Sequence, residues 1–162
     1  MIDPMSVPLA YIITFRCYAT WLHGDDRGSM NRPDAHAAPV RPYNPALENW
    51  ERTNSGPRAY LNAPRRRAVR EAIREACAYR TWQLHAINVR TEHVHVVITA
   101  PVPPERVMTI LKARCTRMLR VAGLAEATER IWSRHGSTDP LWKESDVTAA
   151  CEYTMENQGG DI

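Results

Sequence analysis

The stretch Glu92-His93-Val94-His95-Val96-Val97-Ile98 sets two histidines into a run of branched apolar residues. Its alternation predicts a β-strand whose two histidines point to the same face, because strand neighbours two residues apart share a face. The opposite face would be apolar and consist of Val94, Val96 and Ile98. The run that ends the stretch suits a strand buried on both faces, and therefore central in its sheet. Paired imidazoles can hold one divalent metal, although a pair on a surface strand need have no function.

The residues around this strand predict an ordered series of elements: strand, helix, strand, strand, helix, strand, helix. These are strand 9–17, helix 65–79, strand 81–88, the histidine strand, helix 103–122, two short strands at 130–133 and 140–142 around a turn at 135–139, and a helix from Asp146 to about Asn157 capped by Ser145. This order matches the split βαβ plan. The predicted fold class is α+β, a ferredoxin-like antiparallel sheet with helices on one face plus a C-terminal helix.

A single domain over residues 1–162 is expected, with a long insertion at about 18–63. Repeated prolines and glycines break any helical or strand period in that insertion, so it is expected to be irregular. Its aromatic residues could seal it on the core or stack on bases: Tyr43, Trp50 and Tyr60.

Composition narrows the class of protein. No run of about 18 or more apolar residues is present, which argues against a membrane span. The opening residues lack the basic-then-apolar order of a secretory signal. The four cysteines are far apart, so reduced thiols in a cytoplasmic protein are expected: Cys17, Cys77, Cys115 and Cys151.

Charge is distributed unevenly along the chain, although the formal net charge is only +3. Residues 64–90 carry seven arginines against two glutamates, whereas residues 124–162 carry eight acids against three bases. The two basic helices are either solvated faces or a surface for nucleic acid, because guanidinium groups match phosphate oxygens. The candidate DNA contacts are Arg66, Arg67, Arg70, Arg74, Lys112, Arg114, Arg117 and Arg120.

Tyr153 is expected in the middle of the last helix, with Asn157 one turn later on the same face and Gln158 one residue further. A phenolate can attack phosphorus as a covalent nucleophile. An amide oxygen could join His93 and His95 as the third ligand of a metal, and such nitrogen-plus-oxygen ligation suits Mg²⁺ or Mn²⁺. A helix tyrosine can equally be a packing residue, and an amide near a glycine stop can be a helix-end group.

With Phe15 at the end of the first strand, the histidine stretch and the late tyrosine, the chain resembles the single-tyrosine HUH transposases of the REP-associated and insertion-sequence type. The resemblance covers roughly residues 9–160. It implies a homodimer that cleaves single-stranded DNA at hairpin-flanked sites and rejoins it through a 5′-phosphotyrosine intermediate, with a divalent cation. By motif, His93 and His95 become metal ligands and Tyr153 the nucleophile, while Asn157 or Gln158 would be the third ligand. The long insertion and the short tail depart from the family pattern.

Two other functions remain open at this point. One is a domesticated DNA-binding module that keeps the fold but does not cleave, and whose binding would depend on salt but not on Tyr153. The other is a small metal-dependent hydrolase that would use His93, His95 and Glu92 with a bound water. The sequence also leaves open whether the tyrosine acts within its own chain or on a partner copy.

Overall fold

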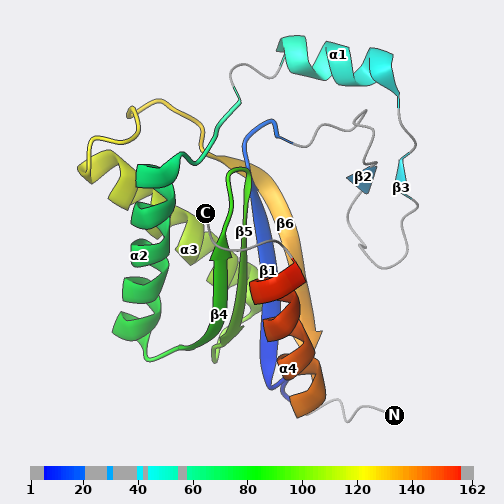
Figure 1. Cartoon of the computed structure of the whole chain (residues 1–162), viewed down its shortest axis with the longest axis vertical. Coiled ribbons are helices and arrows are strands. Elements are labelled where there is room, and N and C mark those ends of the chain that lie inside the picture. The colour runs from blue at the N-terminus through cyan, green and yellow to red at the C-terminus, as the bar shows by residue number, and fades with distance from the viewer. Residues whose placement is uncertain (1–5, 21–28, 31–39, 42–43, 55–57, 158–162) are drawn as a thin grey trace.

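A four-stranded antiparallel sheet forms the centre of the protein (Figure 1). The computed structural model describes residues 6–20, 29–30, 40–41, 44–54 and 58–157. The sheet has the spatial order β4-β5-β1-β6, and its strands are β1 (Ala10–Cys17), β4 (Gln83–Val89), β5 (His93–Thr99) and β6 (Trp132–Leu141). The histidine strand β5 is therefore central, as predicted.

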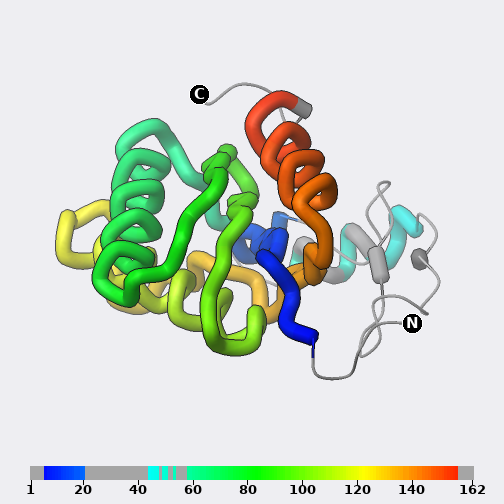
Figure 2. Tube along the Cα trace, turned by 90° about the horizontal axis from the view of Figure 1, so that it is seen from below, coloured from blue at the N-terminus to red at the C-terminus, as the bar shows by residue number. Residues whose placement is uncertain are grey.

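Helices cover both faces of this sheet unequally (Figures 1 and 2). On one face lie α2 (Ala63–Arg80) and α3 (Pro104–Val121), which follow β1 and β5 along the chain. On the other lies α4 (Glu144–Glu152), continued by the π-helical turn η1 (Tyr153–Asn157). Element order and strand order together are those of a ferredoxin-like fold with an added C-terminal helix, which confirms the predicted fold class.

The two faces of β5 belong to different apolar clusters. Val94, Val96 and Ile98 are fully buried in the larger core, together with the apolar stripes of α2 and α3. Val97 is equally buried but packs on the other side, in a small cluster that includes Ala150 of α4. This division confirms the face assignment made from the alternation, and it puts the histidines on the α4 side.

Helix α2 begins and ends at residues that suit its termini. Asn62 Oδ1 accepts a hydrogen bond from the backbone nitrogen of Arg65 at 3.1 Å, which is the usual role of an N-cap side chain. Pro64 lies in the first turn, where its missing N–H costs no helical hydrogen bond. The chain leaves α2 at Thr81, whose φ of 55° lies in the left-handed region.

Strand β6 corrects the prediction of two short strands around a turn. It runs without interruption from Trp132 to Leu141 and pairs with β1, although it contains Gly136 and Pro140. Pro140 is tolerated because, within the described sheet, β6 is an edge strand. Gly136 lies opposite Phe15, where a side chain would collide with the carbonyl oxygen of Thr14 and with Met108 Sδ. The glycine thus reflects close packing, and not a turn.

The insertion is also more regular than predicted. It contains the helix α1 (Pro45–Asn54) and a short antiparallel pair, β2 (Ser29–Met30) with β3 (Val40–Arg41). Asn44 Oδ1 caps α1 by accepting from the backbone nitrogens of Ala46 and Leu47, both at 3.1 Å. Of the expected aromatic contacts, Trp50 is exposed and Tyr60 is partly exposed, while Tyr43 lies outside the described residues.

The last helix differs from its prediction at both ends. It begins at Glu144 and not at Asp146, and Asp146 Oδ2 accepts a hydrogen bond from the backbone nitrogen of Lys143, so Ser145 is not its cap. At Tyr153 the α-helix gives way to the π-helical turn, so it does not continue as a regular α-helix to Asn157. Thr154, and not the half-exposed Met155, completes its buried face.

The four cysteines are free thiols, as expected, and three of them are buried. Within the part of the chain that the structure describes, none of the helices combines the length and apolar character needed to cross a membrane.

Gly136→Ala is predicted to destabilise the fold by about 1–3 kcal/mol, the usual cost of forcing an extra methyl group into a packed site. The added carbon would meet the Thr14 carbonyl, which is backbone and cannot move aside as a side chain can. Urea unfolding followed by circular dichroism measures the change. Ser137→Ala is the matched control, since it adds no atom at the neighbouring position; equal midpoints for Gly136→Ala and wild type would contradict the prediction.

Candidate active site

The two histidines of β5 lie side by side on the sheet face that α4 covers. Their ring centroids are 4.7 Å apart and the ring planes are inclined by 75°. Both ring nitrogens of His93 and the Nε2 of His95 are buried atoms. A pair of imidazoles this close on one rigid strand has the spacing required to share a ligand.

A threonine on the neighbouring strand orients His95. Thr14 Oγ1 and His95 Nδ1 are joined by a hydrogen bond of 2.7 Å, and the two residues are direct partners in the β1–β5 register. When Nδ1 donates to the hydroxyl, the lone pair of the ring is on Nε2. This is the arrangement in which a metal-binding histidine is commonly held, by a partner on its second nitrogen.

Tyr153 stands over this pair from the first residue of the π-helical turn. Its ring centroid is 6.2 Å from that of His95, with the planes inclined by 81°. The side chain is 44% exposed, so it is not a residue of the hydrophobic interior. The phenol and the imidazoles therefore meet within one chain, at a place that solvent reaches.

The π-helical turn is fixed to the sheet by a buried hydrogen bond. Asn88 Nδ2, on β4, donates to the carbonyl oxygen of Thr154 at 2.8 Å. The hydroxyl of Thr154 is itself buried, with no hydrogen-bond partner among the described residues. A π-helical turn is rare and is found frequently at functional sites. Here the turn begins at the tyrosine itself and follows directly on α4.

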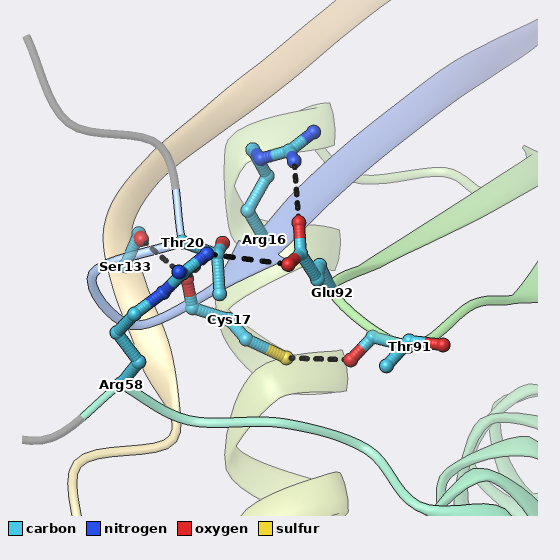
Figure 3. Close-up of polar contacts among 7 residues, drawn as sticks. All are labelled: Arg16, Cys17, Thr20, Arg58, Thr91, Glu92 and Ser133. Atoms are coloured by element: carbon cyan, nitrogen blue, oxygen red, sulfur yellow. Dashed lines mark hydrogen bonds and ion pairs between the residues drawn. The ribbon is translucent and has the colours of Figure 1, made fainter. Parts of the chain in front are cut away.

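An ion-pair cluster borders the histidines where β5 begins. Arg16 is the register partner of His93, and its Nη2 lies 3.7 Å from Glu92 Oε2. Arg58 Nη2 lies 3.3 Å from the other oxygen of the same carboxylate. Figure 3 shows Glu92 between the two guanidinium groups. Glu92 is thus bound to arginines beside the site, which does not suit it to the water-activating role of the hydrolase alternative.

The neighbouring thiol is not suited to chemistry. Cys17 Sγ contacts the carbonyl oxygen of Thr91 at 4.0 Å, and the residue is fully buried (Figure 3). Burial, followed by the charge of Glu92, raises the pKa of this thiol to about 12. A thiol with so high a pKa is not a nucleophile at neutral pH.

Sequence reasoning missed three residues of this face: Thr14, Arg16 and Asn88. The signal that could have found Thr14 and Arg16 is the same alternation that placed the histidines, applied to β1. What alternation cannot supply is the register, which sets Thr14 against His95 and Arg16 against His93. Asn88 likewise pairs with His95 from β4.

The predicted third ligand is not settled. The side chain of Asn157 and the whole of Gln158 lie outside the described residues. Among the described residues, no group of three or more His, Cys, Asp and Glu side chains could hold a metal ion. A complete donor set would therefore need an oxygen of another kind beside the two imidazoles, such as an amide.

The predicted DNA contacts of α2 and α3 lie across the sheet from this site. Both helices pack on the opposite face (Figure 2). Four of these arginines are exposed, and three are partly buried. The exposed ones are Arg67, Arg74, Arg117 and Arg120; the partly buried ones are Arg66, Arg70 and Arg114. The structure thus does not bring this basic surface together with the tyrosine and the histidines.

Lys112, one of the candidate DNA contacts, bonds to the neighbouring strand β6. Its Nζ donates to the carbonyl oxygens of Ser133 at 2.8 Å and His135 at 3.2 Å. Burial lowers the pKa of this ammonium group to about 8. Lys112 therefore connects α3 to β6, a packing role that helical periodicity does not reveal.

A family model and several solved structures are similar to this chain. The model of the family described as "Transposase IS200 like" matches residues 56–152. A solved structure of a REP-associated tyrosine transposase bound to a REP hairpin is similar at 14% identity and a TM-score of 0.52, over 95% of this chain and 70% of that one. A candidate transposase from Deinococcus radiodurans R1 is similar at 13% identity and a TM-score of 0.47, over 99% of this chain and 98% of the other.

No curated protein matches the sequence at a significant level. At such low identity the structural likeness to the REP-associated protein supports the fold alone. The family match covers residues 56–152 out of 162, which is more than half of the chain; it includes the histidine strand and all of α4 and ends one residue before Tyr153. The protein belongs to the IS200-like transposase family.

Proposed function

We propose that this protein is a single-tyrosine HUH transposase that cuts and rejoins single-stranded DNA at hairpin-flanked sites. The observation that carries the proposal is the place of Tyr153, whose ring lies 6.2 Å from that of His95 and is partly exposed. A packing tyrosine would have its ring in the apolar core. This one instead stands beside the edge-to-face pair of His93 and His95, on a turn fixed to the sheet by Asn88.

The chemistry assigned to Tyr153 is phosphoryl transfer. Its phenolic oxygen, having lost its proton to solvent, attacks the scissile phosphorus while the bond from phosphorus to the 3′ oxygen breaks. The leaving oxygen takes up a proton and becomes a 3′ hydroxyl, and the tyrosine carries a 5′-phosphotyrosine bond. A second 3′ hydroxyl then attacks the phosphorus of the phosphotyrosine. The tyrosine oxygen leaves and takes up a proton, and the two DNA ends are joined.

The donor set fits a divalent cation such as Mg²⁺ or Mn²⁺, since His93 and His95 supply two nitrogens and the predicted amide of Asn157 or Gln158 would supply oxygen. A bound cation would polarise the scissile phosphate and stabilise the departing oxygen. The role of Thr14 is to hold the ring of His95 through Nδ1, so that Nε2 faces the ligand.

The remaining parts of the proposal concern DNA and assembly. Residues 1–162 would form one transposase-like domain, and two copies would form a homodimer. The exposed arginines of α2 and α3 would hold the phosphate backbone of the hairpin, on the face opposite the chemistry. Tyr153 and His95 are close within one chain, which favours a site in which the tyrosine works together with the histidines of its own copy.

Tyr153→Phe is predicted to abolish the covalent protein–DNA adduct while leaving DNA binding within about twofold of wild type. The change removes the attacking oxygen alone, at an exposed position. Labelled hairpin DNA with a single-stranded flank, incubated with Mn²⁺ and separated under denaturing conditions, reveals the adduct. Tyr79→Phe is the matched control, being another exposed helical tyrosine. An adduct that persists in Tyr153→Phe refutes the assignment of the nucleophile, and a wild type that binds without forming any adduct favours the non-cleaving module.

Thr14→Val is predicted to weaken Mn²⁺ binding by about ten- to a hundredfold, because it removes the partner of His95 Nδ1 at nearly constant volume. His95→Ala should lower the affinity further. Isothermal titration of the Tyr153→Phe protein measures binding without turnover. His85→Ala serves as control, since His85 bonds to Thr99 on neighbouring strands, away from the pair. Equal affinities for Thr14→Val and its parent would show that the threonine does not orient a ligand.

Arg67→Ala is predicted to weaken hairpin binding roughly equally for all sequences and to lower the slope of log affinity against log salt by about one. Arg67 is exposed on α2, so its loss should not disturb the core. Fluorescence anisotropy at several salt concentrations measures the slope. Arg134→Ala, an exposed arginine of β6, controls for total charge. If the salt slope is unchanged in Arg67→Ala but lower in Arg134→Ala, the surface that binds the phosphate backbone does not lie on α2.

A further inference from the structure

A cavity lies at the end of β1, and neither the two histidines nor Tyr153 line it. Its volume is about 410 Å³, within the range of sites that hold small ligands. Three separate segments of the chain form its walls, contributing Tyr18, Arg58, Ala59, Glu126, Thr128 and Arg130. No residue of this cavity is needed for the chemistry proposed above.

Backbone hydrogen bonds hold these segments together. The nitrogen of Tyr18 donates to the carbonyl oxygen of Ile131 at 2.8 Å, and the nitrogen of Ala59 donates to that of Tyr18 at 3.0 Å. The walls are therefore fixed relative to one another before any ligand arrives. A preformed pocket of this kind spares a ligand the cost of ordering it.

Two arginines are stacked on tyrosines around the cavity. The Arg130 guanidinium carbon lies 4.6 Å from the centroid of the Tyr18 ring, and its Nη1 donates to Tyr18 Oη at 3.4 Å. Arg58 lies 5.2 Å from the centroid of the Tyr60 ring. Arg130 is exposed, so its side chain is accessible from solvent. Guanidinium planes and aromatic rings are the surfaces on which unpaired bases stack.

The charges of the cavity are suited to a nucleotide. The two basic residues of the cavity are Arg58, whose Nη2 is shared with Glu92, and Arg130, and guanidinium groups match phosphate oxygens. Of the two acids at the wall, Glu129 is already paired with Arg65 at 2.9 Å. The remaining acid, Glu126, is exposed and can accept hydrogen bonds from the amino group of a base.

A continuous set of contacts joins the cavity to the histidines. Arg58, in the wall, binds Glu92, and Glu92 binds Arg16, the register partner of His93 (Figure 3). Tyr18 follows Arg16 by two residues on the same chain segment. The cavity and the histidine strand are thus linked by consecutive contacts, so that a single DNA strand can reach both.

We propose that the cavity binds one unpaired nucleotide of the DNA strand, close to the phosphate at which Tyr153 acts. The base stacks on the outer face of Arg130, and its phosphate lies at Arg58. This inference rests on the proposed function, because it takes single-stranded DNA as the substrate. It adds a position at which the protein holds the strand.

The test is an abasic scan in the Tyr153→Phe protein, which binds the strand without cutting it. Oligonucleotides with a hairpin and a single-stranded flank each lack one base of the flank, and fluorescence anisotropy gives their affinities. Loss of the base that enters the cavity should weaken binding by about tenfold, a typical effect for one stacked base. In Arg130→Ala the intact strand should bind about tenfold more weakly, and removal of that base should then cost almost nothing.

Arg134→Ala is the control, because it removes an exposed arginine four residues along without touching the cavity. The Arg134→Ala protein should still lose about tenfold in affinity when the same base is removed. A penalty that persists in Arg130→Ala, or an equal weakening of every strand by Arg130→Ala, would overturn the inference and leave Arg130 a general electrostatic contact. If the wild type forms the adduct but no base shows a loss of affinity that depends on Arg130, only the nucleotide pocket is refuted. If such a loss is found but no adduct forms, only the proposed role of Tyr153 is refuted.

Discussion

The burial of β5 on both faces is the constraint on which the rest of the molecule depends. Residues 94–98 of β5 are buried on both faces, so each of these side chains must suit either the α2–α3 core or the cover provided by α4. Val94, Val96 and Ile98 satisfy the first requirement and are fully buried. Two imidazoles on the other face satisfy the second only if polar partners are present there. The structure supplies such a partner in Thr14, which bonds to His95 from the adjacent strand.

The register of the sheet then determines which side chains lie next to the buried histidine. Because Asn88 and Thr14 are both partners of His95, one row across three strands carries an amide, an imidazole and a hydroxyl. The imidazole is bonded to the hydroxyl within the row, whereas the amide is bonded to the carbonyl of Thr154 in the turn above. The same row that orients the histidine therefore also fixes the segment that carries the tyrosine. A slip of β5 by one residue would turn its histidines to the opposite face, away from both Thr14 and Asn88.

The sequence could predict those features that depend on local periodicity. Alternation placed the histidines and the valines correctly, and the two long helices were found at residues 65–79 and 103–122, close to their observed bounds. It failed where the deciding contact is distant in sequence. Gly136 suggests a turn locally, yet it is required by the closeness of Thr14 and Met108. Lys112 is polar and off the apolar stripe, yet it bonds to carbonyls of β6. The change to a π-helical turn at Tyr153 has no signature in spacing, because the residues that stabilise it, such as Asn88, lie on another strand.

The basic helices and the tyrosine site lie on opposite faces, which raises the question of how one DNA molecule could contact both. The end of the sheet at which β5 begins offers a route. There the nitrogen of Leu61 donates to the carbonyl oxygen of Thr91, so that α2 starts beside the histidine strand. Arg65 and Arg66 occupy the first turn of α2 at this end. Arg58, a few residues earlier in the chain, and Arg16, on β1, both pair with Glu92. Positive side chains thus continue from the outer helix around the sheet end to His93. Since a phosphate backbone follows such cations, a strand could pass from one face to the other without crossing the apolar core or the long edges of the sheet.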